Sequence, residues 1–330
     1  MADRIVIAGA SGFIGQYLVQ AFEADGAQVR VIGRAASGSA PGATNWGDVA
    51  AISALLDGCD LLINLAGKSV NCRYTRANRA EILRSRVETT QELAAAIRAC
   101  AAPPPLWINA STATIYRHAD DRAMGESTGE IGTGFSVSIA RAWEAALFAG
   151  ELPSTRRVAL RMAIVLGVGG ALTPLRTLAR FGLGGPHLDG RWISTRSGRK
   201  YGTFHERGLG GGRQRFSWVH VADVLGSIRY LRGQPQLDGP INLSSPESSD
   251  NRTVMRSIRK AAGLPFGIAA PRWMLELGMF VIRTETELVL KSRWVVPQRL
   301  IESGFAFEYP ALDPALSQIE QSRKGQLTQG

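Results

Sequence analysis

Apolar residues in the first half of the chain alternate between short continuous runs and helical spacing. Ile5-Val6-Ile7-Ala8 predicts a first strand, and residues 13–23 predict a helix whose apolar face carries Ile14, Leu18 and Phe22. Repeated alternation of this kind is typical of an α/β fold with a parallel sheet covered by helices. Further strands are expected at 28–32, 61–65, 106–110 and 158–166, and further helices at 77–100 and 135–149.

The pattern changes after Gly167, where the chain becomes rich in glycine and basic residues. Residues 182–212 contain ten glycines and little periodicity, which predicts a long loop or lid. A strand at 216–221, a helix at 224–231 and a mixed α/β region over 252–320 are expected to follow. We therefore predict a first domain over residues 1–167 and a smaller second domain over 168–330, with elements of the first partly interleaved.

A glycine-rich turn directly follows the first strand and opens the first helix. In a GxxGxxG turn one glycine permits the tight turn, one lets backbone amides approach a pyrophosphate, and one permits close helix–sheet packing. The amino end of the helix presents unpaired N–H groups to negative charge. The position after the first strand predicts a dinucleotide site formed by Gly9, Ser11, Gly12, Phe13, Ile14 and Gly15.

The end of the second strand predicts which dinucleotide is bound. An acidic residue there would bind the ribose hydroxyls of NAD, but this strand ends at Gly33-Arg34 with no adjacent acid. A guanidinium suits a 2′-phosphate through charge-assisted hydrogen bonds. We therefore predict NADP, with NAD less favoured; the alternative is that Arg34 is a solvated surface residue.

Net charge adds one feature to this picture. The 330 residues carry a net charge of +10, which suggests a nucleic-acid partner, but 33 of the 38 basic residues are arginines and most are scattered. Residues 187–215 are different, because seven basic and two acidic residues give them a charge of +5. Without a helix-turn-helix, zinc or aromatic-interleaved motif, nucleic-acid binding is disfavoured.

Cysteine usage and apolar runs indicate the compartment. The three cysteines include no CxxC pair, so we expect neither structural disulfides nor a metal site. The N-terminal segment reads as the first strand of the fold rather than a signal peptide. The apolar stretch at 273–282 is too short to span a bilayer. A soluble cytoplasmic protein with no membrane partner is expected.

Several motifs in order along the chain resemble one protein family. GASGFIG, NLAGKSVNCRYT, EILRSRVETT, ASTATIY, RQRFSWVHVADV and PQRLIESGFAFEYPAL are similar to the epimerase-like branch of the extended short-chain dehydrogenase/reductase superfamily, including YfcH-like bacterial proteins with a C-terminal domain of unknown function. The resemblance implies a doubly wound Rossmann sheet of about seven parallel strands and a smaller C-terminal substrate domain. It also implies cofactor contacts at Leu65, Ala66, Gly67, Glu81, Arg86 and Val165, and among these Arg86 would bind a phosphate. The alternative for Glu81 and Arg86 is that they belong to a solvated face of the helix.

The resemblance also predicts a catalytic set, and part of that set is missing. Superfamily members use a Tyr, a Lys four residues later, and a Ser or Thr; Thr112 matches the last of these. The Tyr and Lys positions fall on Ser136 and Ala140, and the branch generally lacks a well-formed pair there. Tyr116 or an ordered water is expected to move the proton; the alternative role of Tyr116 is loop packing.

Other residues near this motif have weaker assignments. Arg73, Tyr74 and Ser111 are expected to line the substrate site. His220 is expected to be a packing residue rather than a catalyst, and Asp223 to cap the helix that follows it.

Two functional hypotheses remain open from the sequence. The first is an NADP-dependent oxidoreductase or epimerase acting on a small anionic molecule with a non-standard catalytic set. The second is an NADP-binding sensor or scaffold that has lost turnover. Compared with the branch, residues 188–209 look inserted on the substrate side, which predicts a basic lid favouring an anionic ligand. A homodimer is expected by analogy with the superfamily.

Overall fold

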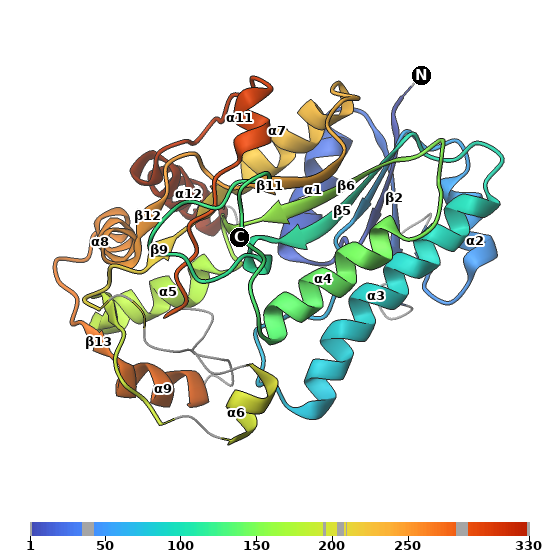
Figure 1. Ribbon diagram of the computed structural model, residues 1–330. Helices are drawn as coiled ribbons and strands as arrows, with labels where there is room; N and C mark the ends of the chain where they lie inside the picture. Colours follow the sequence, from blue (N-terminus) through green and yellow to red (C-terminus); the bar gives the residue numbers. More distant parts are fainter. Residues whose placement is uncertain are drawn as a thin grey trace.

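A seven-stranded parallel sheet forms the centre of the computed structural model, which describes residues 2–34, 43–193, 196–202, 208, 210–281 and 290–328 (Figure 1). Its strands are β1 (Arg4–Ala8), β2 (Gln28–Gly33), β3 (Ala43–Asn45), β4 (Leu61–Asn64), β5 (Leu106–Thr112), β6 (Arg156–Met162) and β11 (Gly239–Leu243). They are arranged in the order β11-β6-β5-β4-β1-β2-β3, and every neighbouring pair is parallel. This order reverses direction at β1 and β4, as a doubly wound sheet requires.

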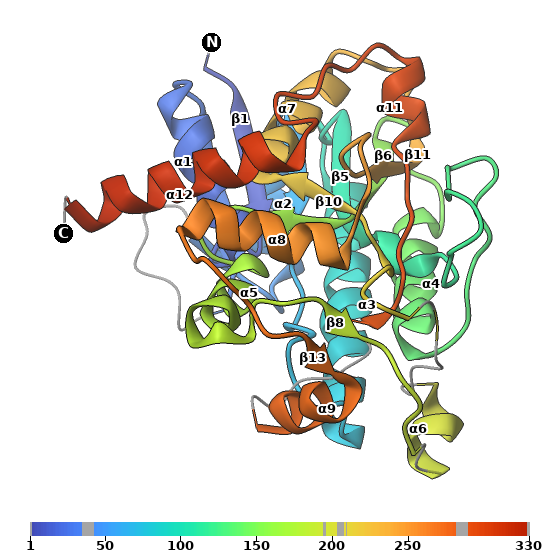
Figure 2. The same cartoon turned by 90° about the vertical axis from the view of Figure 1, so that its left-hand side faces the viewer.

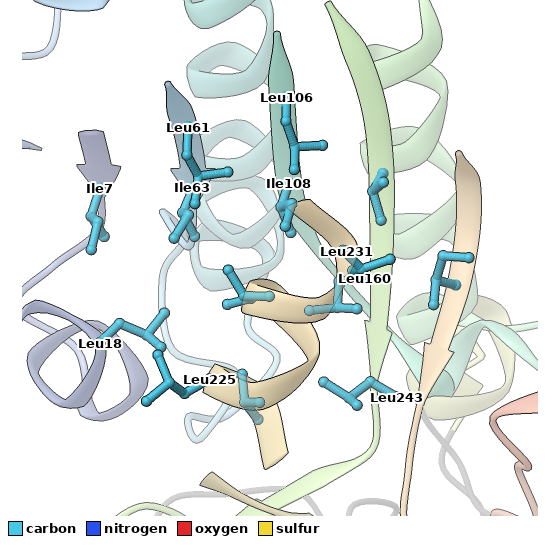
Figure 3. Packing of buried hydrophobic residues seen from close by; sticks show 14 of the residues in the cluster. Ile7, Leu18, Leu61, Ile63, Leu106, Ile108, Leu160, Leu225, Leu231 and Leu243 are labelled. Atoms are coloured by element: carbon cyan, nitrogen blue, oxygen red, sulfur yellow. The ribbon is translucent and has the colours of Figure 1, made fainter. Parts of the chain in front are cut away.

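Helices cover both faces of this sheet because the strand residues are apolar on both faces. The covering helices are α1 (Phe13–Ala24), α2 (Val49–Leu56), α3 (Arg76–Ala99), α4 (Phe135–Phe148) and α7 (Val221–Arg232). Ile5 and Ile7 of β1 pack with α1 and α7, whereas Val6 and Ala8 pack with α2 and α3. Figure 3 shows the first of these layers, with Leu18 and Leu225 against the strands. The predicted Rossmann architecture is confirmed.

Most of the rest of the described chain forms a smaller region beside the carboxyl ends of the strands (Figure 2). Its elements are η2 (Ala113–Ile115), β7 (Ile164–Leu166), α5 (Leu172–Leu178), the π-helical turn η3 (Ala179–Leu183), β8 (His187–Leu188), α6 (Arg196–Tyr201), β9 (Arg215–Phe216), β10 (Trp218–His220), β12 (Ser249–Asp250), α8 (Asn251–Ala262), β13 (Ala270–Pro271), α9 (Arg272–Val281) and α12 (Leu312–Thr328). The short helix α11 (Gln298–Glu302) instead packs beside β11, with Leu300 in the core of the large sheet. Helices α5, α8 and α12 share a core with Trp218. Because α7 and β11 return to the large sheet, the two regions are interleaved.

Two expected strands are each divided in the structure. The strand expected at 158–166 becomes β6 and β7, separated at Ala163, and β7 leaves the large sheet to pair with β10. The strand expected at 216–221 becomes β9 and β10, which pair with β12 and β7 respectively. The apolar pattern continues across each division, so it did not reveal these changes of partner.

The start of α7 differs from the prediction that Asp223 caps it. The helix begins three residues earlier than the expected 224, and the Nδ1 atom of His220 accepts a hydrogen bond from the Ala222 amide at 3.2 Å. Asp223 lies inside the first turn, where its carboxylate accepts hydrogen bonds from the amides of Glu308 and Tyr309. His220 is therefore the cap, and it is buried as a packing residue.

The segment expected to be a long loop contains regular structure. Within residues 182–212 the chain completes η3 and forms β8 and the short helix α6. Residues 194–195, 203–207 and 209 of this segment lie outside the described residues. In the described part of the chain no helix has the length and apolar character needed to cross a membrane.

A buried ion pair connects strand β6 to helix α4, and β5 is hydrogen-bonded to the same pair. The Nε and Nη2 atoms of Arg161 on β6 donate to the two carboxylate oxygens of Glu144 on α4 at 2.8 and 2.7 Å. Ser111 of β5 donates to the same carboxylate at 2.6 Å, and Nη1 of Arg161 donates to the Tyr116 hydroxyl at 2.8 Å. That hydroxyl donates to Asn242 of β11 at 2.9 Å. All five residues are at least 90% buried.

Substituting Glu144 is expected to destabilise the protein. Glu144→Gln leaves the buried Arg161 guanidinium without a compensating charge, so we expect a loss of about 3 kcal/mol in the free energy of unfolding, measured by urea denaturation. The matched control is Glu88→Gln, which removes an exposed carboxylate paired with Arg84 and should cost no more than about 0.5 kcal/mol. Equal losses in the two variants would contradict a structural role for the buried pair.

Candidate functional site

Two cavities meet at the glycine-rich turn between β1 and α1. We call the first, of about 450 Å³, the β2-side cavity; Gly9, Ser11, Gly33 and Arg34 are among its lining residues. The second, of about 380 Å³, is the β5-side cavity, and it is bounded by the turn, α3, α4 and the ends of β5 and β6. Gly9 lines both. The cavities therefore lie at the carboxyl ends of the strands where the strand order reverses, the usual ligand position in such sheets.

A larger cavity, of about 1030 Å³, lies at the opposite ends of the strands. It is lined by four arginines, but these already have partners. Arg156 donates to the carbonyls of Leu231 and Leu237, while Arg229 and Arg232 pair with Asp25 and Asp3. The amino ends of parallel strands are not where doubly wound folds bind ligands. We therefore assign the candidate site to the β2-side and β5-side cavities, although they are smaller.

The glycines of the turn are required by close contacts. Gly9 has a φ of +80°, and a Cβ there would lie 2.7 Å from the carbonyl carbon of Leu65. A Cβ on Gly15 would lie 2.6 Å from the carbonyl oxygen of Gly9. A Cβ on Gly12 would meet nothing closer than 3.6 Å, so its small size leaves open space beside the turn. The turn is thus shaped to hold something against its backbone.

The amino end of α1 faces this open space. Gly12 is the N-cap residue and supplies no side-chain oxygen to the first-turn amides. These amides carry partial positive charge from the helix dipole and would accept an anionic group. Phe13, Ile14 and Gly15 line the β5-side cavity from the same turn. The turn therefore fits the pyrophosphate of a dinucleotide.

The structure brings together most of the residues predicted to contact a cofactor. Leu65, Arg86 and Val165 line the β5-side cavity together with the turn, and Gly33 and Arg34 line the β2-side cavity. Ala66 lies behind this wall, where its amide donates to the Asn64 side chain at 3.0 Å. Gly33 and Arg34 thus line one cavity and Leu65, Arg86 and Val165 line the other, with Gly9 bordering both.

Gly67 and Glu81 have different positions from those expected. Gly67 packs behind Arg86, because a Cβ there would lie 3.0 Å from the guanidinium carbon. Glu81 lines neither cavity; its partly exposed carboxylate pairs with Arg84 on the surface of α3. Glu81 therefore does not line the predicted cofactor site. Its position agrees with the alternative, a solvated face of the helix.

Arg86 is the charged residue of the β5-side cavity. Its Nη1 atom donates to the carbonyls of Lys68 and Ile82, each at 3.0 Å, and its guanidinium carbon lies 5.0 Å from the centroid of the Trp143 ring. No carboxylate within the described ranges pairs with it. Burial lowers the pKa of Arg86 to about 10, so it stays protonated at neutral pH. An uncompensated buried cation that lines a cavity favours an anionic or electron-rich ligand.

The residues predicted to act on the substrate separate into two groups. Thr112 lines the β5-side cavity, and its hydroxyl accepts a hydrogen bond from the Thr114 amide at 3.2 Å. Ser111 also lines the cavity, with its hydroxyl proton given to Glu144. Tyr116 is 1% exposed and lies outside the cavity. Its hydroxyl accepts a hydrogen bond from Arg161 and donates one to Asn242. Burial also raises the pKa of Tyr116, so its predicted role in proton transfer is not supported.

The helix that should carry the Tyr and Lys instead presents small residues. Ser136 lines the β5-side cavity, but Ala140 is fully buried against Ala113, Ile115 and Tyr116. Tyr74 lines the same cavity, packed edge-to-face on Phe135 at 4.8 Å between ring centroids. Arg73 is half-buried and does not line it. The lining role expected of Tyr74 matches its position, and that of Arg73 does not.

Other lining residues were not foreseen from the sequence. In the β5-side cavity they include Phe135, Ile139 and Trp143, which are spaced four residues apart on one face of α4. Their helical spacing is visible in the sequence, but only the packing of α4 against α3 shows that this face borders a cavity. In the described part of the chain no cluster of three His, Cys, Asp or Glu side chains is arranged to hold a metal.

The basic segment approaches the same cavity from the outside. The Phe135 amide, at the start of α4, donates to the carbonyl of Gly202 at 3.3 Å. The Arg79 guanidinium of α3 lies 3.6 Å from the centroid of the Tyr201 ring. Figure 1 shows α6 beside the amino ends of α3 and α4. The segment thus contacts the two helices that form one wall of the β5-side cavity.

The doubly wound sheet and glycine cradle define a Rossmann protein of the short-chain dehydrogenase/reductase type. Residues 5–240 match the NAD dependent epimerase/dehydratase family, and residues 270–319 match a domain of unknown function, DUF1731. The chain belongs to the NAD dependent epimerase/dehydratase family, which confirms the resemblance seen in the sequence.

Relatives align over almost the whole chain. Epimerase family protein SDR39U1 of Mus musculus is 30% identical over 323 residues, covering 96% of this chain and 99% of the relative. Epimerase family protein YfhF of Bacillus subtilis is 29% identical over 325 residues, covering 97% and 99%. The crystal structure of human SDR39U1 with NADPH superposes with a TM-score of 0.81 at 28% identity, covering 96% of this chain and 99% of that one.

Gly9→Ala is expected to destabilise the turn more than a matched glycine substitution elsewhere. The positive φ should cost about 1–2 kcal/mol, and the backbone contact at 2.7 Å about 1–3 kcal/mol more. Gly26→Ala is the control, because Gly26 has a φ of +83° with nothing within 4 Å of a Cβ. Urea denaturation measures both variants. Equal losses of unfolding free energy would show that the turn tolerates a side chain.

Proposed function

We propose that this protein binds NADP(H) and acts as an oxidoreductase or epimerase on a small anionic substrate. The observation that carries this proposal is a glycine cradle at the amino end of α1 with Arg34 lining the same cavity. The cradle suits a pyrophosphate, and Arg34 stands where a 2′-phosphate would lie. The fold and the family support the proposal, because both are built around dinucleotide binding.

The preference for NADP over NAD rests on charge at the end of β2. That strand ends at Gly33 and Arg34 follows, and none of the described residues that line this cavity is acidic. A carboxylate at this place would repel a 2′-phosphate, whereas a guanidinium can bind it through paired hydrogen bonds. The crystallised human relative was solved with NADPH, which supports the same preference here.

The chemistry proposed for the site is hydride transfer, which bound NADP(H) supplies. The chain's own contribution begins with Thr112, whose hydroxyl is held in the cavity by Thr114 and would orient the substrate oxygen. Phe135, Ile139 and Trp143 form an apolar wall that would exclude water. Arg86 would neutralise a phosphate or another negative group next to this wall.

We also propose that the substrate is anionic. Helix α6 carries Arg196, Arg199 and Lys200 without an acidic residue, and it lies beside the helices that form the cavity wall. A group of cations near an entrance raises the local concentration of an anionic ligand. A cytoplasmic location and a homodimer remain predictions from the sequence; the cysteines of the described chain are all free thiols.

Arg34→Ala should abolish the preference for NADPH. We expect wild-type protein to bind NADPH about 10- to 100-fold more tightly than NADH, because the 2′-phosphate gains charge-assisted hydrogen bonds. Removing the guanidinium should bring the two dissociation constants together, as measured by nicotinamide fluorescence. The control is Arg30→Ala, an exposed arginine of β2 outside the cavity. Equal wild-type affinities for NADPH and NADH would contradict the preference.

The second candidate function is an NADP-binding sensor or scaffold without turnover. Ser136 and Ala140 favour it, because neither can relay a proton from a substrate held by Thr112. The two functions separate in a substrate panel. Purified protein with NADPH would be tested on neutral and anionic carbonyl compounds and on sugar nucleotides, with turnover followed at 340 nm.

We expect turnover with an anionic member of the panel. Added salt should raise the KM for that compound. Deleting residues 190–208 should remove the salt dependence of KM. Asp189 accepts hydrogen bonds from the amides of both Gly190 and Gly208, at 2.8 and 2.7 Å. The two ends of the deleted segment therefore lie close together and can be joined. Tight NADPH binding without turnover on any compound would favour the sensor. An unchanged KM and salt dependence after deletion would contradict the basic lid.

A further inference from the structure

The β5-side cavity requires an acid/base group that α4 does not provide. Oxidation of an alcohol releases a proton from the hydroxyl, and a serine hydroxyl at Ser136 is too weak a base to take it. Ala140 is enclosed by other side chains and cannot contribute a cation. The network around Glu144 has already engaged Tyr116. A protein group that accepts this proton must therefore come from outside α4.

Two lining residues outside α4 have the required chemistry. Among the described residues that line the β5-side cavity, Tyr74 is the one phenol and Arg86 is the one charged side chain. The remaining polar side chains of the lining are the hydroxyls of serine and threonine and the indole of Trp143. A phenol with a pKa near about 10 becomes a useful base near neutral pH when an adjacent cation stabilises the phenolate.

The packing places Tyr74 and Arg86 in successive layers of one wall. Tyr74 is 7% exposed and packs against Ile82 of α3 and Ile139 of α4. Arg86 follows Ile82 by four residues, and Trp143 follows Ile139 by four residues. Tyr74 packs between the two isoleucines. The Arg86 guanidinium stacks on Trp143 one helical turn further along α3 and α4.

The electrostatics of this wall favour a phenolate. Arg86 is partly buried and has no carboxylate partner within the described ranges, so its charge is not neutralised by the protein. Burial lowers the pKa of Arg86, while the acidic groups that act on it and raise its pKa are Tyr74 and Cys72. The other cation near Tyr74 is Arg79, whose guanidinium donates to the Tyr74 backbone carbonyl at 2.9 Å. The charge of Arg86 would thus stabilise a phenolate, whereas the observed contact of Arg79 is with the backbone of Tyr74.

We propose that Tyr74 is the acid/base group of this site and that Arg86 is the cation that holds it in the reactive state. Both come from the segment between β4 and the middle of α3 rather than from α4. The inference rests on the proposed function, since it assigns the proton step of the same hydride transfer.

The reaction balances with these groups and NADP+ as the oxidant. When an alcohol is oxidised, its C–H bond breaks with the electron pair, and the hydride forms a new bond to the nicotinamide ring. The hydroxyl O–H bond breaks, and its proton passes to the phenolate oxygen of Tyr74. The products are a carbonyl compound, NADPH and a neutral Tyr74; reduction follows the reverse path. Thr112 orients the substrate oxygen throughout.

The titration of Tyr74 tests the proposal without a known substrate. Protein labelled with 13Cζ-tyrosine would be titrated by NMR with and without NADP+, and Tyr74→Phe would identify the resonance. We expect a Tyr74 pKa at least about one unit below the usual value of about 10. Arg86→Met should raise that pKa by about one unit, because the phenolate loses its nearest uncompensated cation.

Two controls accompany this titration. Arg86→Lys keeps the charge and should keep the pKa low, and it replaces Arg86→Met if that variant does not fold. Tyr201→Phe removes a phenol that stacks on Arg79 outside the cavity, so it should leave the Tyr74 resonance unchanged. A Tyr74 pKa at or above about 10, or one that does not respond to Arg86→Met, would overturn the proposal.

Cofactor binding separates this inference from the function on which it rests. NADPH affinity would be measured by fluorescence on the same samples. Tight NADPH binding together with an ordinary Tyr74 pKa would contradict only the role of Tyr74 and Arg86. Absence of NADPH binding would contradict the proposed function and, with it, the hydride step assigned to Tyr74.

Discussion

The buried ion pair of Glu144 and Arg161 is the constraint on which the candidate site depends. A carboxylate and a guanidinium that are both more than 90% buried must satisfy each other, so their positions determine how β6 and α4 meet. The same carboxylate orients Ser111, and the same guanidinium orients Tyr116. Buried hydrogen bonds between β5, β6 and α4 thus hold the floor of the β5-side cavity.

This constraint also decides which residues are available for chemistry. Tyr116 follows Thr112 by four residues and is the obvious phenol in the sequence, but the ion pair takes its hydroxyl into the protein interior. Thr112 and Ser111 stay at the cavity surface because β5 ends there. The groups that we propose for the proton step therefore lie on the wall formed by α3 and α4, where Tyr74 and Arg86 line the cavity.

Charge is divided between the two cavities in a way that suits a phosphorylated dinucleotide. Arg34 lines the β2-side cavity and Arg86 the β5-side cavity, with the amino end of α1 between them. Each carries out a different task in the proposed function: Arg34 selects the 2′-phosphate, and Arg86 supplies positive charge near the reacting groups. The excess charge of the chain is otherwise held in surface arginines and in the segment around α6.

The sequence by itself determined the α/β architecture and the cofactor turn, because both depend on local features. Alternating apolar periods predict strands and helices, and Gly9, Gly12 and Gly15 are spaced by the demands of one tight turn. Arg34 was also predictable, since it follows directly on β2. The tertiary structure alone decided that Tyr116 lies outside the cavity, because its hydroxyl contacts residues from distant segments. A buried partner such as Arg161, 45 residues from Tyr116, leaves no periodic signal in the chain, yet it removes that phenol from the site.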